Sequence, residues 1–267
     1  MPVQYNVSYC TELPETRVLD LYLPEENKNG AAILFIHGGG WAKGDKEQFR
    51  DVAAWFVEHG FVCASMKYRL STEKPYPAAL EDARLAMQYM RVHANELGFN
   101  PAKIASAGSS AGGYLAAMLA LIQPDDKLGQ TAELVMTDTR PNAVALYCPV
   151  TTLHVDREFI LKFMAVPESE APERYREGSP IDRISEDAPP FIIMQGDEDK
   201  TTPLAEVRAF AEKLMEAGSR AEVVALPGVK HGFSYGITSE AQQRSIQSIL
   251  AFLQNEFALS ELSIKRR

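Results

Sequence analysis

The chain has 267 residues, 46% of them hydrophobic and 24% charged, and a formal net charge of −9. This length and composition are typical of one soluble domain with a substantial core, so we expect a single domain over residues 1–267. Nucleic acids and anionic membrane surfaces both need clustered positive charge, and the negative balance therefore predicts neither as a partner. The dense basic run at residues 265–267 is expected to be a solvated tail.

The N-terminus, Met1–Tyr5, has neither a basic region nor an apolar stretch, so no signal peptide is visible. A secreted chain with its leader removed would look the same. No apolar run approaches the roughly 20 residues that span a bilayer. The cysteines Cys10, Cys63 and Cys148 are odd in number and lack metal-ligand spacing. We therefore expect a cytoplasmic protein with no disulfide framework and no bound metal.

Several segments have the pattern of strands. Residues 19–23 alternate between apolar and more polar side chains, which is typical of a half-exposed strand. Residues 31–36 are apolar throughout, as expected for a strand buried on both faces. Similar runs lie at 61–66, 104–107, 143–147, 191–194 and 221–226. The first strands follow one another with no helical segment between them, which predicts an antiparallel start to the sheet.

Segments with helical spacing lie between the later strands. Apolar residues recur three and four apart over 80–97, ending at Gly98, over 204–214, and over 246–257 near the C-terminus. Alternating strands and helices predict an α/β fold, with a mostly parallel central sheet and helices on both faces.

Residues 150–190 break this rhythm, because they are long, charged and poor in clear periodicity. Two interpretations remain open for this segment. It is either a small cap inserted over the active site or an ordinary surface segment that covers no site.

The pentapeptide Gly108-Ser109-Ser110-Ala111-Gly112 lies between the run at 104–107 and an apolar, helix-prone run at 111–121. In a Gly-x-Ser-x-Gly motif the serine occupies a strained strand-to-helix turn, and small neighbours allow the backbone to pass closely. Ser110 has glycines at both −2 and +2, whereas Ser109 has Ala107 at −2. Ser110 is therefore the predicted nucleophile of an α/β-hydrolase fold.

A glycine run, His37-Gly38-Gly39-Gly40-Trp41, directly follows the buried strand at 31–36. Nucleophilic attack on a carbonyl creates an oxyanion, which needs preorganised N–H donors. We expect the backbone N–H groups of Gly39, Gly40 and Ala111 to supply them. His37 is then expected to brace the loop through hydrogen bonds.

The general base follows from the order of the residues. In this fold the serine precedes the acid, and the acid precedes the histidine. Of the five histidines, only His154 and His231 follow Ser110, and only His231 lies beyond the acidic turn after the strand at 191–194. His231 is therefore the predicted base. Spacing alone does not choose its acid among Asp197, Glu198 and Asp199.

These motifs resemble the esterases of the hormone-sensitive-lipase group and the bacterial feruloyl/acetyl (acetylxylan) esterases. The resemblance covers roughly residues 17–256. It implies that Asp199 is the acid of the triad and that Asp197 is a turn residue. Further matching segments are Tyr68-Arg69-Leu70, Tyr76-Pro77-Ala78 with Asp82, Pro189-Pro190 and His231-Gly232-Phe233. The resemblance implies structural roles for Tyr68, Arg69 and Asp82.

The glycine loop begins already at His37, whereas hormone-sensitive-lipase relatives usually carry a sizeable N-terminal cap before it. The compact form is more similar to the feruloyl/acetyl esterases. We therefore expect a serine esterase that cleaves short-acyl esters, of the acetyl or feruloyl type or on acetylated carbohydrate, without a cofactor. Trp41, Tyr114 and Phe233 are candidate pocket residues. The sequence defines no oligomeric state.

Three other activities fit part of the pattern. The His-Gly-Gly-x-Trp loop is similar to that of arylformamidases, which hydrolyse a formyl amide. A serine peptidase of the prolyl-oligopeptidase kind shares the late acid and histidine, but the chain has no room for its propeller. A catalytically inactive hydrolase fold that serves as a receptor usually lacks a triad member, whereas Ser110, Asp199 and His231 are all present.

Overall fold

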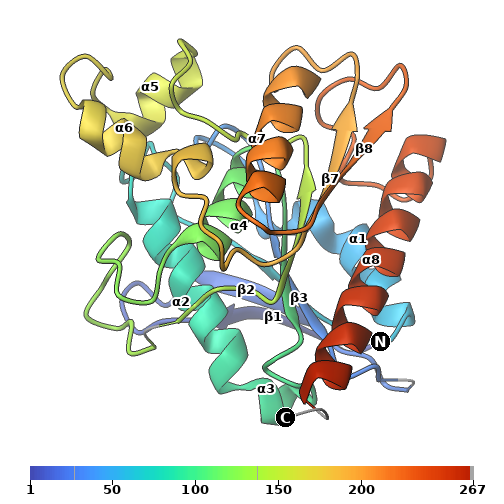
Figure 1. Cartoon of the computed structure of the whole chain (residues 1–267). Helices are drawn as coiled ribbons and strands as arrows, with labels where there is room; N and C mark the ends of the chain where they lie inside the picture. The colour runs from blue at the N-terminus through green and yellow to red at the C-terminus, as the bar shows by residue number, and fades with distance from the viewer. Residues whose placement is uncertain (27, 137, 265–267) are drawn as a thin grey trace.

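The computed structural model describes residues 1–26, 28–136 and 138–264, so the basic run at 265–267 lies outside the described residues. Within these ranges eight strands form one sheet, in the order β1-β2-β4-β3-β5-β6-β7-β8 (Figure 1). The strands are β1 (Val3–Ser8), β2 (Val18–Tyr22), β3 (Ala32–Ile36), β4 (Val62–Met66), β5 (Ile104–Ser109), β6 (Ala143–Tyr147), β7 (Phe191–Gly196) and β8 (Ala221–Leu226). The strand β2 pairs antiparallel with β1 and with β4, and the other neighbours are parallel. The predicted mostly parallel sheet with an antiparallel start is confirmed.

Helices cover both faces of the sheet. The helical segments are η1 (Lys46–Phe49), α1 (Arg50–Glu58), α2 (Ala78–Val92), α3 (Ala94–Leu97), α4 (Ala111–Leu121), α5 (Glu158–Met164), α6 (Pro172–Gly178), η2 (Pro180–Asp182), α7 (Leu204–Glu216) and α8 (Glu240–Ile264). The strand β3 shows how the core divides. Its Ile33 and Phe35 pack in the cluster formed with α1 and α8, and its Leu34 and Ile36 pack with α2, α4 and α7. Successive side chains of a strand point to opposite faces, so this fully apolar strand serves two cores.

The structure differs from the sequence expectations in three places. The strand β1 was not predicted, because its Val-Gln-Tyr-Asn-Val-Ser sequence lies half-exposed at the sheet edge and pairs only with β2. The helix α1 was not predicted either. The helical pattern over 80–97 is divided at His93 into α2 and α3, and Gly98 ends it with φ +84°.

The segment at 150–190 contains α5, α6 and η2, which lie together beyond the edge of the sheet near α4 and α7 (Figure 1, yellow). It therefore forms a small helical insertion between β6 and β7. None of the helices in the described part of the chain has the length and apolar character needed to cross a membrane.

Candidate active site

Ser110 lies at the sharp turn between β5 and α4. It adopts φ +53° and ψ −116°, a conformation that costs a non-glycine residue energy and holds its hydroxyl above the sheet. The two motif glycines make this turn possible. A Cβ atom on Gly108 would lie 2.2 Å from the carbonyl oxygen of Gly112, and one on Gly112 would lie 2.0 Å from that of Ile36. The Gly-x-Ser-x-Gly spacing thus reflects close backbone packing around the serine.

A chain of hydrogen bonds joins three of the predicted residues. The Oγ atom of Ser110 lies 2.9 Å from His231 Nε2, and His231 Nδ1 lies 2.7 Å from Asp199 Oδ2. Ser110 ends β5, Asp199 lies in the turn after β7, and His231 lies in the loop after β8. Parallel strands bring their carboxyl ends to the same edge of the sheet. For this reason His231 meets both Asp199, 32 positions away in the chain, and Ser110, 121 positions away.

The geometry distinguishes the three acidic residues of the turn after β7. Asp199 is buried, and its Oδ1 accepts the backbone N–H groups of residues 201 and 202 at 2.8 and 2.9 Å. Asp197 and Glu198 are exposed, and Asp197 accepts the backbone N–H of Gly228 at 2.7 Å. Only Asp199 faces His231, so Asp197 acts as a turn residue that joins the loops after β7 and β8.

The charges of His231 and Asp199 depend on each other. Burial alone lowers the pKa of His231, but the hydrogen bond to Asp199, followed by the contact with Cys148, raises the pKa above its ordinary value. Burial alone raises the pKa of Asp199, but its bonds to His231 and to the N–H of Thr202 lower the pKa overall. The site therefore favours a carboxylate beside an imidazole that readily takes up a proton.

The glycine loop after β3 faces Ser110. Gly39 adopts φ +113°, and a Cβ atom there would lie 2.1 Å from the carbonyl oxygen of Lys43, so no other residue fits. Among the described residues, no acceptor engages the N–H groups of Gly39, Gly40 or Ala111. These three donors are available to an anionic oxygen near Ser110.

His37 braces this loop from below. Its buried Nδ1–H donates to the carbonyl oxygen of Gly38 at 2.8 Å, and its ring stacks on Tyr68 at 4.2 Å. The Tyr68 hydroxyl donates to the carbonyl oxygen of His37 at 3.1 Å. Burial lowers the pKa of His37 to about 4, so the imidazole is neutral and serves as a fixed donor.

Tyr235 holds the same loop from the other side, and the sequence analysis missed it. Its hydroxyl accepts the backbone N–H of Gly38 at 2.7 Å, across 197 positions of the chain. Tyr235 lies four residues beyond His231, so it links the glycine loop to the loop that carries the imidazole. No local pattern marks this tyrosine, because its partner is a backbone group on a distant strand end.

A cleft of about 520 Å³ opens over Ser110 and His231. It is lined by Gly39, Gly40, Ala42, Lys43, Gln48, Ser109, Ser110, Glu158, Phe159, Lys162, Thr201, His231, Gly232 and Tyr235. Three of these residues, Glu158, Phe159 and Lys162, belong to α5. The insertion therefore forms one wall of the cleft.

Trp41, Tyr114 and Phe233, the candidate pocket residues, are not among the residues that line this cleft. Trp41 and Tyr114 have no exposed surface, and the Trp41 ring stacks on Phe163 of α5 at 3.9 Å. Phe233 is half-buried and packs edge-on against Tyr147 at 5.9 Å. The aromatic wall comes from Phe159, whose ring lies 5.9 Å from that of Trp41. The sequence did not indicate Phe159, because its position depends on how the insertion folds back.

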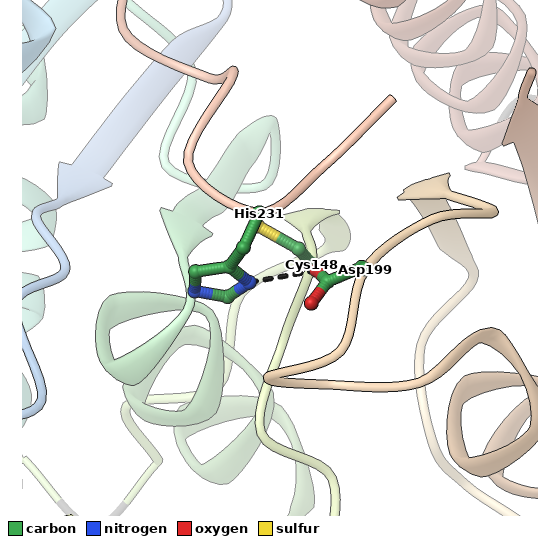
Figure 2. A group of neighbouring side chains, drawn as sticks. All are labelled: Cys148, Asp199 and His231. Atoms are coloured by element: carbon green, nitrogen blue, oxygen red, sulfur yellow. Dashed lines mark hydrogen bonds and ion pairs between the residues drawn. The ribbon is translucent and has the colours of Figure 1, made fainter. Parts of the chain in front are cut away.

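One group of side chains in this site has donor atoms suited to a metal. Each of Cys148, Asp199 and His231 offers one donor atom, and these three atoms lie within 4.8 Å of one another (Figure 2). The spacing of these residues in the chain, 148, 199 and 231, did not suggest such a group. The absence of a local metal motif therefore does not exclude metal binding here.

Comparisons with known proteins identify the family of this chain. The BD-FAE family model matches residues 19–214. The probable carboxylic ester hydrolase LipM of Mycobacterium tuberculosis is 30% identical, with 95% of this chain and 61% of LipM covered. Esterase LipC of the same organism is 32% identical, with 81% and 57% covered. The chain thus spans less than two thirds of the length of these curated relatives.

Among solved structures, Thermogutta terrifontis esterase 2 is similar over nearly its whole length. Its butyrate-bound form has a TM-score of 0.79 at 30% identity, with 95% of this chain and 93% of that chain covered. Its propionate-bound form has a TM-score of 0.79 at 29% identity, with the same coverage. With its sheet, its nucleophile turn and a matching family model over most of its length, the chain belongs to the BD-FAE family of α/β-hydrolase esterases.

Proposed function

We propose that this protein is a serine carboxylic-ester hydrolase that cleaves short-acyl esters through an acyl-enzyme. The observation that carries the proposal is the hydrogen-bonded chain from Ser110 through His231 to Asp199, which opens into a cleft beside unengaged N–H donors. The names of the relatives, carboxylic ester hydrolase and esterase, support the same reaction.

The reaction follows from the positions of these atoms. His231 Nε2 takes the hydroxyl proton as Ser110 Oγ attacks the ester carbonyl, and Asp199 stabilises the imidazolium that forms. The N–H groups of Gly39, Gly40 and Ala111 bind the oxyanion, and loss of one such donor costs roughly 3 kcal/mol in transition-state stabilisation. Collapse of the intermediate passes the proton to the leaving alcohol. Water that His231 deprotonates then releases the acid.

Carboxylates bound in a related structure support a short acyl group. The related Thermogutta esterase was solved with butyrate and with propionate bound. We therefore extend the proposal to acetyl, propionyl and butyryl esters, on small alcohols or on carbohydrate.

The test of the reaction is Ser110→Ala assayed on p-nitrophenyl acetate, where we expect turnover to fall on the order of 10⁶-fold. Wild-type turnover in this variant would overturn the proposed nucleophile. An acyl series from acetate to laurate tests the substrate class, and a preference for laurate would refute it. Faster turnover of N-formylkynurenine than of any ester would show an arylformamidase instead.

A further inference from the structure

We infer that Cys148, Asp199 and His231 form a binding site for a thiophilic divalent cation, such as Zn²⁺ or Cd²⁺, whose occupation switches the hydrolase off. The binding itself depends only on the geometry of this group. The inhibition rests on the proposed function, because two of the three ligands belong to the proposed triad.

The three side chains come from the ends of three neighbouring strands, β6, β7 and β8, and converge on one point (Figure 2). Cys148 follows β6 directly with φ +39°, in the left-handed region that a cysteine rarely adopts. Its backbone is held there by the N–H bond to the carbonyl oxygen of Met194 at 2.9 Å and by the Thr202 hydroxyl, which donates to its carbonyl oxygen at 3.2 Å. The sulfur therefore has a fixed position beside the imidazole.

The distances suit a tetrahedral ion after small side-chain shifts. Donor atoms of the three residues lie within 4.8 Å of one another, and the shortest separation is the 2.7 Å between His231 Nδ1 and Asp199 Oδ2. Zinc binds sulfur at about 2.3 Å and imidazole nitrogen at about 2.0 Å, so neighbouring ligand atoms lie roughly 3–4 Å apart. The hydroxyl of Thr202, 3.0 Å from Asp199 Oδ2 and 3.4 Å from His231 Nδ1, completes a fourth position.

The donor set determines which cations fit. A thiolate and an imidazole select Zn²⁺ and Cd²⁺ over Mg²⁺ and Ca²⁺, which prefer several oxygen ligands. The thiolate and the Asp199 carboxylate together balance the charge of the cation, so a buried ion is compensated. His231, whose side chain is 24% exposed, borders the cleft and provides the route of entry.

The consequence for catalysis follows from the protons. Binding releases the proton of the Cys148 thiol to solvent and displaces the single proton of the neutral His231 imidazole from Nδ1 to Nε2, because the cation occupies the sulfur and Nδ1. The imidazole stays neutral, and its proton now lies on Nε2, which faces Ser110 Oγ at 2.9 Å. An Nε2–H can donate but cannot accept, so the base is lost while the cleft and the oxyanion donors stay in place. We therefore expect kcat to fall and KM to stay unchanged.

The first experiment is a titration of esterase activity with Zn²⁺ and Cd²⁺, reversed by EDTA, with Mg²⁺ and Ca²⁺ as comparison ions. Cys148→Ala is the test variant, and Cys10→Ala is the matched control, since Cys10 is a half-buried free thiol that donates to the carbonyl oxygen of Glu12. We expect the wild type and Cys10→Ala to be inhibited alike. Cys148→Ala should need at least about 10–100-fold more metal. Equal sensitivity of Cys148→Ala and the wild type would overturn the inference.

A second experiment does not depend on activity. In a Cys10→Ala/Ser110→Ala protein, addition of Cd²⁺ should produce the ultraviolet thiolate-to-cadmium charge-transfer band, and further replacement Cys148→Ala should abolish it. If this protein shows the band and the wild type hydrolyses no ester, the proposed function is refuted and the metal site is retained. If the wild type hydrolyses esters and this protein shows no band, the metal site is refuted and the proposed function is retained.

Discussion

At the scale of single residues, the site depends on strain and burial that few side chains tolerate. Ser110 holds its hydroxyl on a backbone with φ +53°, and the sheet and α4 on either side maintain that conformation. Asp199 is buried yet charged, because four backbone or side-chain donors and His231 surround its carboxylate. The positions of the hydroxyl and of the imidazole thus depend on the packing around them.

The choice of Asp199 as the acid predicts a particular pH dependence. His231 must be neutral to act as a base, so activity is lost as the pH falls through its pKa. Asp199 helps to raise that pKa, so we expect the acidic limb of kcat/KM above pH 6.5 in the wild type. Asp199→Asn should lower kcat roughly 10⁴-fold and move the limb to lower pH. Asp197→Asn is the control and should leave the profile unchanged; the opposite pattern would make Asp197 the acid.

Tyr235 is predicted to position the glycine loop. Tyr235→Phe leaves the N–H of Gly38 without its acceptor, a loss of about 1–3 kcal/mol for a buried donor. Because this loop carries the oxyanion donors, we expect kcat to fall about 10-fold or more while KM stays close to the wild type, and the unpaired donor should lower the melting temperature by roughly 2–10 °C. Steady-state kinetics and thermal melts check this, with the exposed Tyr5→Phe as control. A rise in KM with unchanged kcat would instead make Tyr235 a substrate contact.

At the scale of elements, the insertion that carries α5 and α6 packs apolar side chains into the larger core, and charged side chains tie its segments together. His154 contacts Glu168 and, at 2.6 Å, Asp182, and so ties together its first loop, its middle and η2. Arg157 pairs with Glu206 of α7. The wall that α5 supplies to the cleft therefore depends on ion pairs around its base.

His154 should hold the insertion more strongly at low pH. Burial alone lowers its pKa, but the hydrogen bonds to Glu168 and Asp182 raise the pKa above its ordinary value. A raised pKa in the folded protein means that the stabilisation is complete below about pH 6.5 and is lost as the pH rises through the raised value.

The variant His154→Gln tests this at the level of the backbone. At pH 6 we expect faster hydrogen exchange over residues 152–182 than in the wild type, and the difference should vanish at alkaline pH, after correction for intrinsic exchange rates. His93→Gln, which removes an exposed histidine paired with Glu96, is the control. A difference that persists equally at both pH values would contradict an ionic clamp.

At the scale of the whole molecule, one buried ionic cluster joins three distant parts of the chain. Asp82 of α2 has no exposed side-chain surface and lies 2.7 Å from both Arg17, which precedes β2, and Arg69, which follows β4. It also accepts the backbone N–H of Arg69 at 2.7 Å. The cluster therefore fixes the antiparallel edge of the sheet to the helix that covers it, the structural role that the resemblance implied.

Loss of the Asp82 charge should destabilise the entire fold. Asp82→Asn keeps the side-chain volume but removes the one carboxylate that both buried guanidinium groups share, leaving Arg17 only the exposed Glu12 and Arg69 only Glu81. We expect a loss of about 3–5 kcal/mol in the free energy of unfolding. Denaturation in urea measures this, with Glu25→Gln as the control because its pair with the N-terminus is exposed. Equal stability of the two variants would show that the cluster contributes no net stabilisation.

The sequence by itself determined seven of the eight strands of the described chain and several of its longer helices, and it named the candidate serine and histidine. Apolar runs and helical periodicity reflect the burial of each segment, and this pattern can be read from neighbouring residues. Ser110, the glycine loop and His231 were predicted from motifs of small residues that allow close packing and from the order of residues in the chain. The edge strand β1 was not predicted, because its residues are half-exposed and it pairs with another segment of the chain.

Only the tertiary structure decided which side chains meet. It placed Phe159 in the cleft and Trp41 outside its lining, linked Tyr235 to Gly38, separated Asp199 from Asp197, and brought Cys148 beside the imidazole. The physical reason is that each of these contacts joins the ends of different strands or a helix of the insertion. Their chemistry depends on distances through space, which no periodicity along the chain records.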